Sequence, residues 1–364
     1  MKSEAKKYNN IKLALGITEA VVSFILLLLF VALGYSSSLE NFIRGYFSND
    51  YLVLGAFVLI LGIASAVIFS PLNFYTGYFL EHKYNLSNQT FIKWIWEGAK
   101  GIMVGAVIGL PVLVIFYYVI RSFGIYWWVP FGIVLFVLSV VLARLVPVII
   151  LPIFYKVTPV DNDSLKEKIV KLCSAVNLKV DNVYKFNMSK NTRKANAAFT
   201  GLGKTKRIIL GDTLLENYSE DEIETVIAHE LGHYKRKHIV KNIAISTVSS
   251  FLLFFLIAQM HSLSLVWFGF SSISQISSFP VLVLWASLIG LIQTPLSNYI
   301  SRKFEYEADE YAVKSTGKKD AFIKTLDKLT EQNLGDKEPH RFVEWFFYSH
   351  PSIKNRIAGI QRVD

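Results

Sequence analysis

The sequence predicts a mainly α-helical protein that crosses a membrane several times and carries a small α/β portion outside it. Composition is the first observation: 52% of the 364 residues are hydrophobic and only 18% are charged, whereas soluble proteins carry about 25% charged residues. The second is that the apolar residues form runs of about 20, the length at which a helix crosses the hydrocarbon core. The polar segments between these runs are long enough to form a folded portion in water.

Six apolar runs predict six membrane-spanning helices. They are residues 11–35, 51–70, 102–120, 126–150, 239–260 and 280–299. The first run is too long for the core of a signal peptide and no small-residue cleavage site follows it, so we expect a true span. Residues 262–279 are also apolar, but serines and Gly269 interrupt them. We therefore expect a loop or a short re-entrant piece there.

The basic residues predict the orientation, because lysine and arginine concentrate on the cytosolic side of membrane proteins. With a cytosolic N-terminus, only Arg44 and Arg121 of the 38 lysines and arginines fall on the outside. Both termini and the large polar segments are then cytosolic. The net charge of +10 gathers beside apolar spans, so we expect anionic lipid headgroups, and no nucleic acid, as its partner.

Four portions follow along the chain. We expect a membrane domain at 1–155 with four spans, a cytosolic portion at 156–238, two further spans at 239–299 and a C-terminal cytosolic portion at 300–364. The cytosolic portion is predicted to be mixed α/β, with a helix over 163–176 and short strands at 183–188 and 207–210. Its last helix begins at Ser219, where Glu222 completes the pattern of a capping box.

That capped helix carries the sequence His229-Glu230-Leu231-Gly232-His233. Histidines at i and i+4 share one face of a helix, so both imidazoles can converge on one Zn²⁺ at about 2.0–2.1 Å. Glu230 is rotated about 100° from His229, so it can reach a water on the metal and remove its proton for attack on a carbonyl. A chance match on an ordinary helix is the alternative, but the independent start signal and the apolar preceding turns speak against it. The pattern predicts a zinc metalloprotease with one zinc per chain and Glu230 as general base.

The third zinc ligand has to come from another segment, since catalytic zinc sites use three protein ligands and keep one open position. Glu305 and Asp309 follow the last span and lie at i and i+4. We assign Glu305 as the ligand, and Asp309 as the acceptor that orients a ligating histidine. Glu307, rotated roughly 200° from Glu305, is expected to face away. The alternative for this segment is a solvated, charged helix end.

Two further histidines have more than one interpretation. His238 follows the zinc helix, where it is either a residue of the site or a cation that caps the helix end. His350 precedes Pro351 and is either structural or a donor to the oxyanion of a tetrahedral intermediate.

Most of the chain resembles the type I CAAX prenyl protease family of integral-membrane zinc metalloproteases. The resemblance rests on several motifs in a fixed order: Pro71 with Phe74-Tyr75 and Glu81, Leu86 to Thr90 with Trp94, Pro152 to Phe154, Thr158 to Val160, Asn196 to Phe199, the zinc helix with His238, Ser301 to Asp309, and Ser349 to Pro351 with Arg356-Ile357. The resemblance implies a barrel of six or seven spans around a large intramembrane chamber. It also implies removal of the last three residues from C-terminal Cys-a-a-X peptides whose cysteine is prenylated.

By position, the resemblance assigns roles to further residues. Glu305 matches the glutamate ligand, Asn196 and Ala197 match an edge strand that aligns substrate, and His350 and Arg356 match C-terminal residues near the site. The chain departs from the family in showing six clear spans rather than seven and in lacking a long polar insertion between the last two. These departures suggest a prokaryotic member in the plasma membrane, and they leave open whether its peptide or protein substrate is prenylated.

Two other functions stay open on sequence alone. One is a quality-control membrane protease of the heat-shock type, which uses similar ligands with fewer spans ahead of the zinc helix. The other is a transporter or scaffold with an inert zinc site. Ionisable residues within the spans would favour transport, and the spans contain almost none beyond Glu19 and Arg144.

Overall fold

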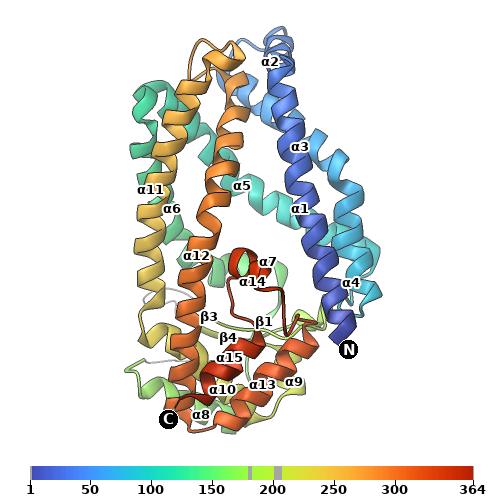
Figure 1. The fold of residues 1–364 in the computed structure, drawn as a ribbon, viewed down its shortest axis with the longest axis vertical. Helices are drawn as coiled ribbons and strands as arrows, with labels where there is room; N and C mark the ends of the chain where they lie inside the picture. The colour runs from blue at the N-terminus through green and yellow to red at the C-terminus, as the bar shows by residue number, and fades with distance from the viewer. Residues whose placement is uncertain (1, 179–182, 201–206, 364) are drawn as a thin grey trace.

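Long helices stand above a compact α/β portion (Figure 1). The structure is a computed structural model that describes residues 2–178, 183–200 and 207–363. The long helices are α1 (Lys2–Ala32), α3 (Asp50–Phe74), α5 (Phe91–Phe123), α6 (Trp128–Leu145), α11 (His238–Ser264) and α12 (Phe279–Thr316). In the described chain, five continuous helical segments are long and apolar enough to cross a membrane, and the one at 91–154 contains both α5 and α6. The six predicted spans are therefore confirmed as helices.

Five of the six observed helices are longer than the predicted spans, because residues at their ends continue the helical hydrogen bonding; α6 is shorter than 126–150, since residues 146–150 form a π-helical turn. Helix α12 has 38 residues, so it is about 57 Å long at 1.5 Å per residue. It does not end at the boundary expected near residue 299. Instead it passes from the apolar band into the α/β portion and carries Glu305 and Asp309 there.

The far end of the molecule is closed by short elements. Helix α2 (Tyr35–Arg44) has ten residues, too few to cross a membrane. Its buried Glu40 accepts a hydrogen bond from the backbone N–H of Ser277 at 2.8 Å. Residues 266–268 and 276–278 form single 3₁₀ turns, so the loop expected at 262–279 is largely confirmed. Two more short helices, α4 (Leu80–Lys83) and α7 (Leu151–Phe154), lie at the opposite end of the spans.

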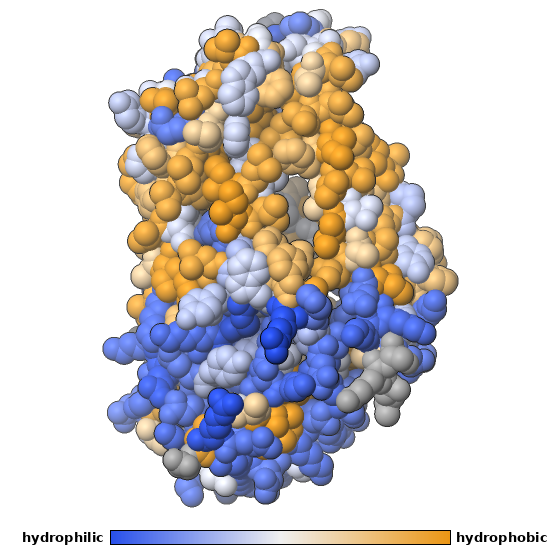
Figure 2. Space-filling model, in the orientation of Figure 1, coloured by the Kyte–Doolittle hydropathy of each residue, from blue (hydrophilic) through white to orange (hydrophobic). Residues whose placement is uncertain are grey.

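The apolar core is divided between the two ends of the molecule. One buried cluster joins α2, α3, α5, α6, α11 and α12 at the far end, and another fills the α/β portion. Between them, the spans leave many large apolar side chains exposed. Figure 2 shows this region as an apolar band with a hollow in its middle. A solid bundle would bury one face of every helix along its length. The spans instead pack together at the two ends and surround a hollow between them, like the bars of a cage.

The α/β portion is built on a four-stranded sheet. The strands are β1 (Val157–Pro159), β2 (Val183–Phe186), β3 (Ala197–Thr200) and β4 (Arg207–Gly211), in the order β1-β2-β4-β3. Strand β2 is parallel to β4, while β3 pairs antiparallel with β4 alone and is thus an edge strand. The surrounding helices are α8 (Asp163–Ser174), α9 (Asp212–Asn217), α10 (Glu220–Lys235), α13 (Lys319–Gln332), α14 (Arg341–Phe347) and α15 (Ile353–Gln361). The predicted helix at 163–176 and both predicted strands are confirmed within two residues.

Helix α10 begins at the predicted capping box and packs closely on α12. Ser219 N–H donates to Glu222 Oε2 at 2.8 Å, and Glu222 N–H donates to Ser219 Oγ at 3.3 Å. Further along α10, a Cβ atom on Gly232 would lie 2.9 Å from Ala308 Cα and 3.0 Å from Ala308 O. Glycine at 232 and alanine at 308 therefore allow the two helix backbones to come into direct contact.

Replacing Gly232 by alanine should destabilise the protein, because the new methyl group meets the backbone of α12 and cannot be relieved by rotating a side chain. Overpacking of this kind costs about 1–3 kcal/mol. We expect a lower midpoint of thermal unfolding for the detergent-purified variant. Gly290→Ala is the matched control, since a Cβ there has no atom within 4 Å. Equal midpoints for the two variants would contradict this account of the contact.

Candidate metal centre

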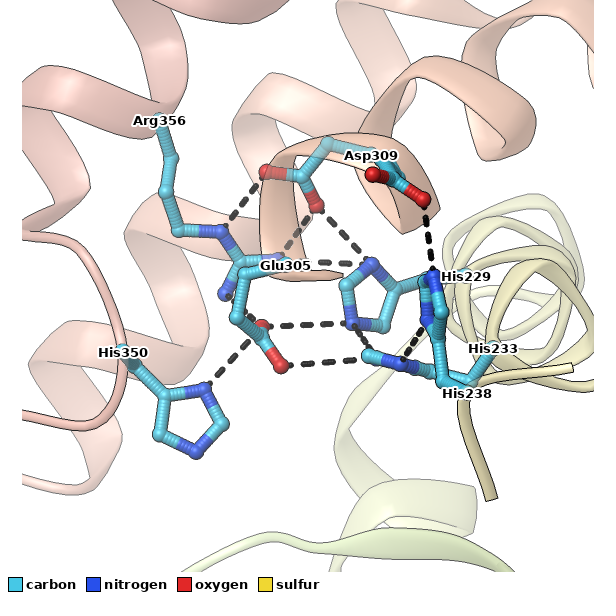
Figure 3. A network of polar contacts seen from close by, with 8 residues as sticks. His229, His233, His238, Glu305, Asp309, His350 and Arg356 are labelled. Atoms are coloured by element: carbon cyan, nitrogen blue, oxygen red, sulfur yellow. Dashed lines mark hydrogen bonds and ion pairs between the residues drawn. The ribbon is translucent and has the colours of Figure 1, made fainter. Parts of the chain in front are cut away.

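Helices α10 and α12 bring three ligand groups together. His229 and His233 come from successive turns of α10 and Glu305 from α12, and one ligand atom of each lies within 4.8 Å of the others. His229 Nε2 is 3.2 Å from His233 Nε2, and the Glu305 carboxylate oxygens lie 3.5 and 3.4 Å from these two nitrogens (Figure 3). The structure thus brings together the three residues that the sequence predicted as ligands.

The protonation of His229 makes this cluster suited to a cation. His229 Nδ1 lies 2.8 Å from Asp309 Oδ1. A carboxylate only accepts, so Nδ1 carries a proton and Nε2 is the ring nitrogen that faces the cluster. Burial opposes charge on His229, yet Asp309 and Glu305 outweigh it and raise the pKa of His229 to about 9, so a cation is favoured at Nε2, either as a proton or as a metal ion that replaces it. The site therefore favours positive charge where the lone pairs converge, and the residues present fit a metal ion.

A second chain of contacts leads away from His233. His233 Nδ1 lies 2.9 Å from His238 Nδ1, and His238 Nε2 lies 3.0 Å from Glu307 Oε2. His238 is buried and stacks on Phe304, so it does more than cap the end of α10. The expectation that Glu307 faces away was wrong: its carboxylate turns from Glu305 but meets His238 on the other side of the cluster.

Arg356 holds Asp309 from α15. Its Nε and one terminal nitrogen lie 2.9 and 2.5 Å from the two oxygens of Asp309. Another terminal nitrogen is 3.7 Å from Glu305 Oε2. The side chain is only 13% exposed, so its hydrogen-bonding capacity is directed largely at these carboxylates.

A cavity of about 470 Å³ opens beside the cluster. Glu230 and His350 line it, together with Asn196 and Ala197 of the edge-strand region. His350 Nδ1 is 3.0 Å from Glu305 Oε2, and the side chain is 65% exposed. Its apolar lining residues include Leu214, Val226, Phe322, Leu326, Leu329 and Ile353. The predicted catalytic and substrate-binding residues, including the largely buried Arg356, thus all line this one cavity.

Several residues of this cavity were not expected from the sequence. Phe322 packs near the His229 ring, with centroids 6.1 Å apart, and Asn333 and Tyr348 also line the cavity. They come from α13 and the segments that follow it. Phe322 and Asn333 lie in no recognisable motif, while Tyr348 directly precedes the motif at Ser349 to Pro351; the packing of α13 on α10, and of α15 on α12 and α13, reveals their place.

Two protein-family models together match nearly the whole chain. The family model described as "CAAX prenyl protease N-terminal, five membrane helices" matches residues 2–156, and the model of peptidase family M48 matches residues 159–364. In the first stretch, this chain has four helices of membrane length and the ten-residue α2.

Relatives include an uncharacterised metalloprotease, YhfN, of Bacillus subtilis, which is 30% identical over 98% of this chain and 85% of its own length. CAAX prenyl protease 1 of Saccharomyces cerevisiae is 32% identical over 84% of this chain and 72% of the relative. The crystal structure of S. mikatae Ste24p matches with a TM-score of 0.86 at 27% identity, over 99% of this chain and 88% of that one.

These matches decide between the classes that the sequence left open. A transporter or scaffold would not be expected to match a peptidase model over residues 159–364, nor to share a fold with Ste24p over 99% of the chain. The chain belongs to peptidase family M48, and within it to the integral-membrane metalloproteases of the CAAX prenyl protease type.

Proposed function

We propose that this protein is a zinc endopeptidase that shortens the C-terminus of prenylated peptides. His229, His233 and Glu305 would hold one zinc ion per chain, and their convergence is the observation that carries the proposal. Two imidazoles and a carboxylate form a donor set typical of catalytic zinc, which keeps a fourth position open. The cavity beside these residues has room for a peptide.

The zinc ion would supply Lewis acidity, which polarises a carbonyl and lowers the pKa of water. Glu230 follows His229 on α10 and lines the same cavity, so it is placed to take the proton of the attacking water. It would then return that proton to the leaving amine. His350 has Nδ1 on Glu305, which leaves its Nε2 to donate to the oxyanion.

Four residues would orient the ligands. Asp309 accepts the proton of His229 Nδ1, and Arg356 fixes both oxygens of Asp309. His238 would accept from His233 Nδ1 and donate to Glu307. Each ligating histidine is thereby linked to a carboxylate, directly or through one imidazole, as is common around metal sites. Arg356 is proposed as a residue that positions Asp309 rather than as a direct substrate contact.

A second cavity supports a substrate with an attached lipid. It measures about 820 Å³, lies between α1 and α12, and has apolar walls that include Phe342, Phe346 and Phe347. Tyr348 and His350 follow directly in the chain and line the peptide cavity. A prenyl chain in the bilayer would thus lie beside the peptide to be cut. A quality-control protease needs no such lipid, so the two substrates are separable by experiment.

The arrangement also supports a cytosolic active site. Both termini lie at the end that holds the α/β portion (Figure 1), as an even number of crossings requires. Arg44 and Arg121, the two basic residues expected outside, both bind Asp50 at the opposite end. We propose the plasma membrane of a prokaryote as the location.

Glu230→Gln should abolish most turnover while keeping the metal, because the amide cannot accept the proton of the water. General-base loss lowers rates by about 10²–10⁴-fold. The measurement is cleavage of a farnesylated Cys-a-a-X peptide, alongside zinc content, in detergent-purified protein. The same peptide without the farnesyl group tests the substrate class: equal cleavage of both would favour quality-control proteolysis. Wild-type activity in the variant would rule Glu230 out as the base.

Glu305→Gln should lose zinc as well as activity, because a neutral amide is a much poorer ligand than a carboxylate. We expect the variant to hold less than one zinc per chain. In the wild type, a chelator should remove activity and added zinc should restore it. Full zinc content together with full activity in Glu305→Gln would show that the third ligand lies elsewhere.

Glu307→Ala should weaken zinc binding, since His238 would lose the acceptor that fixes its ring. Loss of such outer partners typically costs about 10–100-fold in metal affinity. Competition with a chromophoric chelator measures it. Glu310→Ala, on the same helix and paired with exposed Lys314, is the matched control and should bind zinc like the wild type. Unchanged affinity in Glu307→Ala would remove Glu307 from the site.

A further inference from the structure

The edge strand β3 presents its main-chain groups alternately to β4 and to the open side. Gly211 N–H donates to Asn196 O at 2.9 Å, so the main chain of Asn196 faces the sheet. Successive residues of an antiparallel pair alternate between bonded and non-bonded positions. The N–H and C=O groups of Ala195 and Ala197 therefore face outward, where a peptide can pair with them.

Side chains from the end of α13 already occupy part of this edge. Ala195 N–H donates to Asn333 Oδ1 at 2.9 Å, and Asn333 Nδ2 donates to Ala195 O at 3.1 Å. Gln332 Nε2 donates to Arg193 O at 2.8 Å. The Asn333 amide thus makes the two bonds that a neighbouring strand would make, and Ala195 is closed to substrate.

Ala197 is the next outward-facing residue, and no hydrogen bond to its outward groups occurs within the described ranges. It lines the peptide cavity together with Glu230 and Asn333. The open part of the edge therefore starts at Ala197. Asn333 blocks the edge on the other side of Ala197, at Ala195. Leu334 follows Asn333, and its carbonyl oxygen accepts a hydrogen bond from Asn9 Nδ2 of α1 at 2.8 Å. Helix α1 therefore contacts this end of the cavity.

A peptide that pairs antiparallel with β3, the commoner mode of strand addition, runs opposite to the 197→200 direction. Its C-terminal end then points toward Ala195. We propose that Asn333 is a specificity-determining residue, which stops main-chain pairing beyond Ala197 and so limits how many residues can follow the scissile bond. The proposal rests on the proposed peptidase function and gives a structural cause for a short C-terminal leaving peptide.

The test is a series of prenylated peptides that differ only in the number of residues after the scissile bond, from one to eight. For the wild type we expect kcat/KM to fall steeply once this tail exceeds a few residues. Asn333→Ala removes both bonds to Ala195 and frees its edge groups. The ratio of kcat/KM for the longest tail to that for the best short tail should then rise on the order of tenfold. Mass spectrometry of the products reports any new cleavage position.

A purely structural role of Asn333 would lower kcat/KM for every peptide by the same factor and leave that ratio unchanged. Asn162→Ala is the control, because it removes an asparagine that caps α8 and contacts Glu220 without touching β3. Asn333→Ser serves if the alanine variant does not fold. An unchanged ratio in the variants, or a wild type indifferent to tail length, overturns the proposal. A wild type that cleaves no peptide refutes the peptidase function itself, and this inference with it.

Discussion

The contact between α10 and α12 is the constraint on which the rest of the site depends. Gly232 has no side chain, so the backbone of α10 lies directly against Ala308. That distance places His229 and His233 opposite Glu305, with ligand atoms 3.4–3.5 Å apart. A larger residue at position 232 would press against the backbone of α12 and so disturb the spacing of these groups. The geometry of the candidate metal centre therefore depends on the packing of α10 on α12 as well as on the ligand residues themselves.

The same contact couples the site to the membrane cage. Helix α12 is continuous from the far end of the spans to Thr316, so its carboxylates are carried on an element that also lines the bilayer. Helix α1 joins from the other side, where Tyr8 Oη donates to Glu81 Oε1 at 2.5 Å and Lys194 contacts Glu81 Oε2 at 3.0 Å. Hydrogen bonds and packing thus connect the edge strand β3, the histidine–carboxylate cluster and the membrane-spanning helices.

The buried carboxylates of the cluster lie beside positively charged or donor groups, although Glu305 Oε2 has no hydrogen-bond partner among the described residues. Glu305 and Asp309 are both almost fully buried, which is costly unless each charge is paired and hydrogen-bonded. Arg356 and the histidines provide those pairs. The arrangement also fixes the orientation of the His229 ring, with Nδ1 on Asp309 and Nε2, the nitrogen that could bind a metal ion, pointing into the site.

The sequence alone determined the spans, the capped helix and the residues with a local pattern. Apolar runs, Ser219 with Glu222, and histidines four residues apart depend on spacing along one helix, which the chain itself dictates. Glu305 could be proposed because it follows a span and lies four residues before Asp309. Only the tertiary structure decided that α12 continues past residue 299, that Glu307 meets His238, and that Asn333 closes the edge at Ala195. The last two are contacts between segments far apart in the chain, which no local periodicity records.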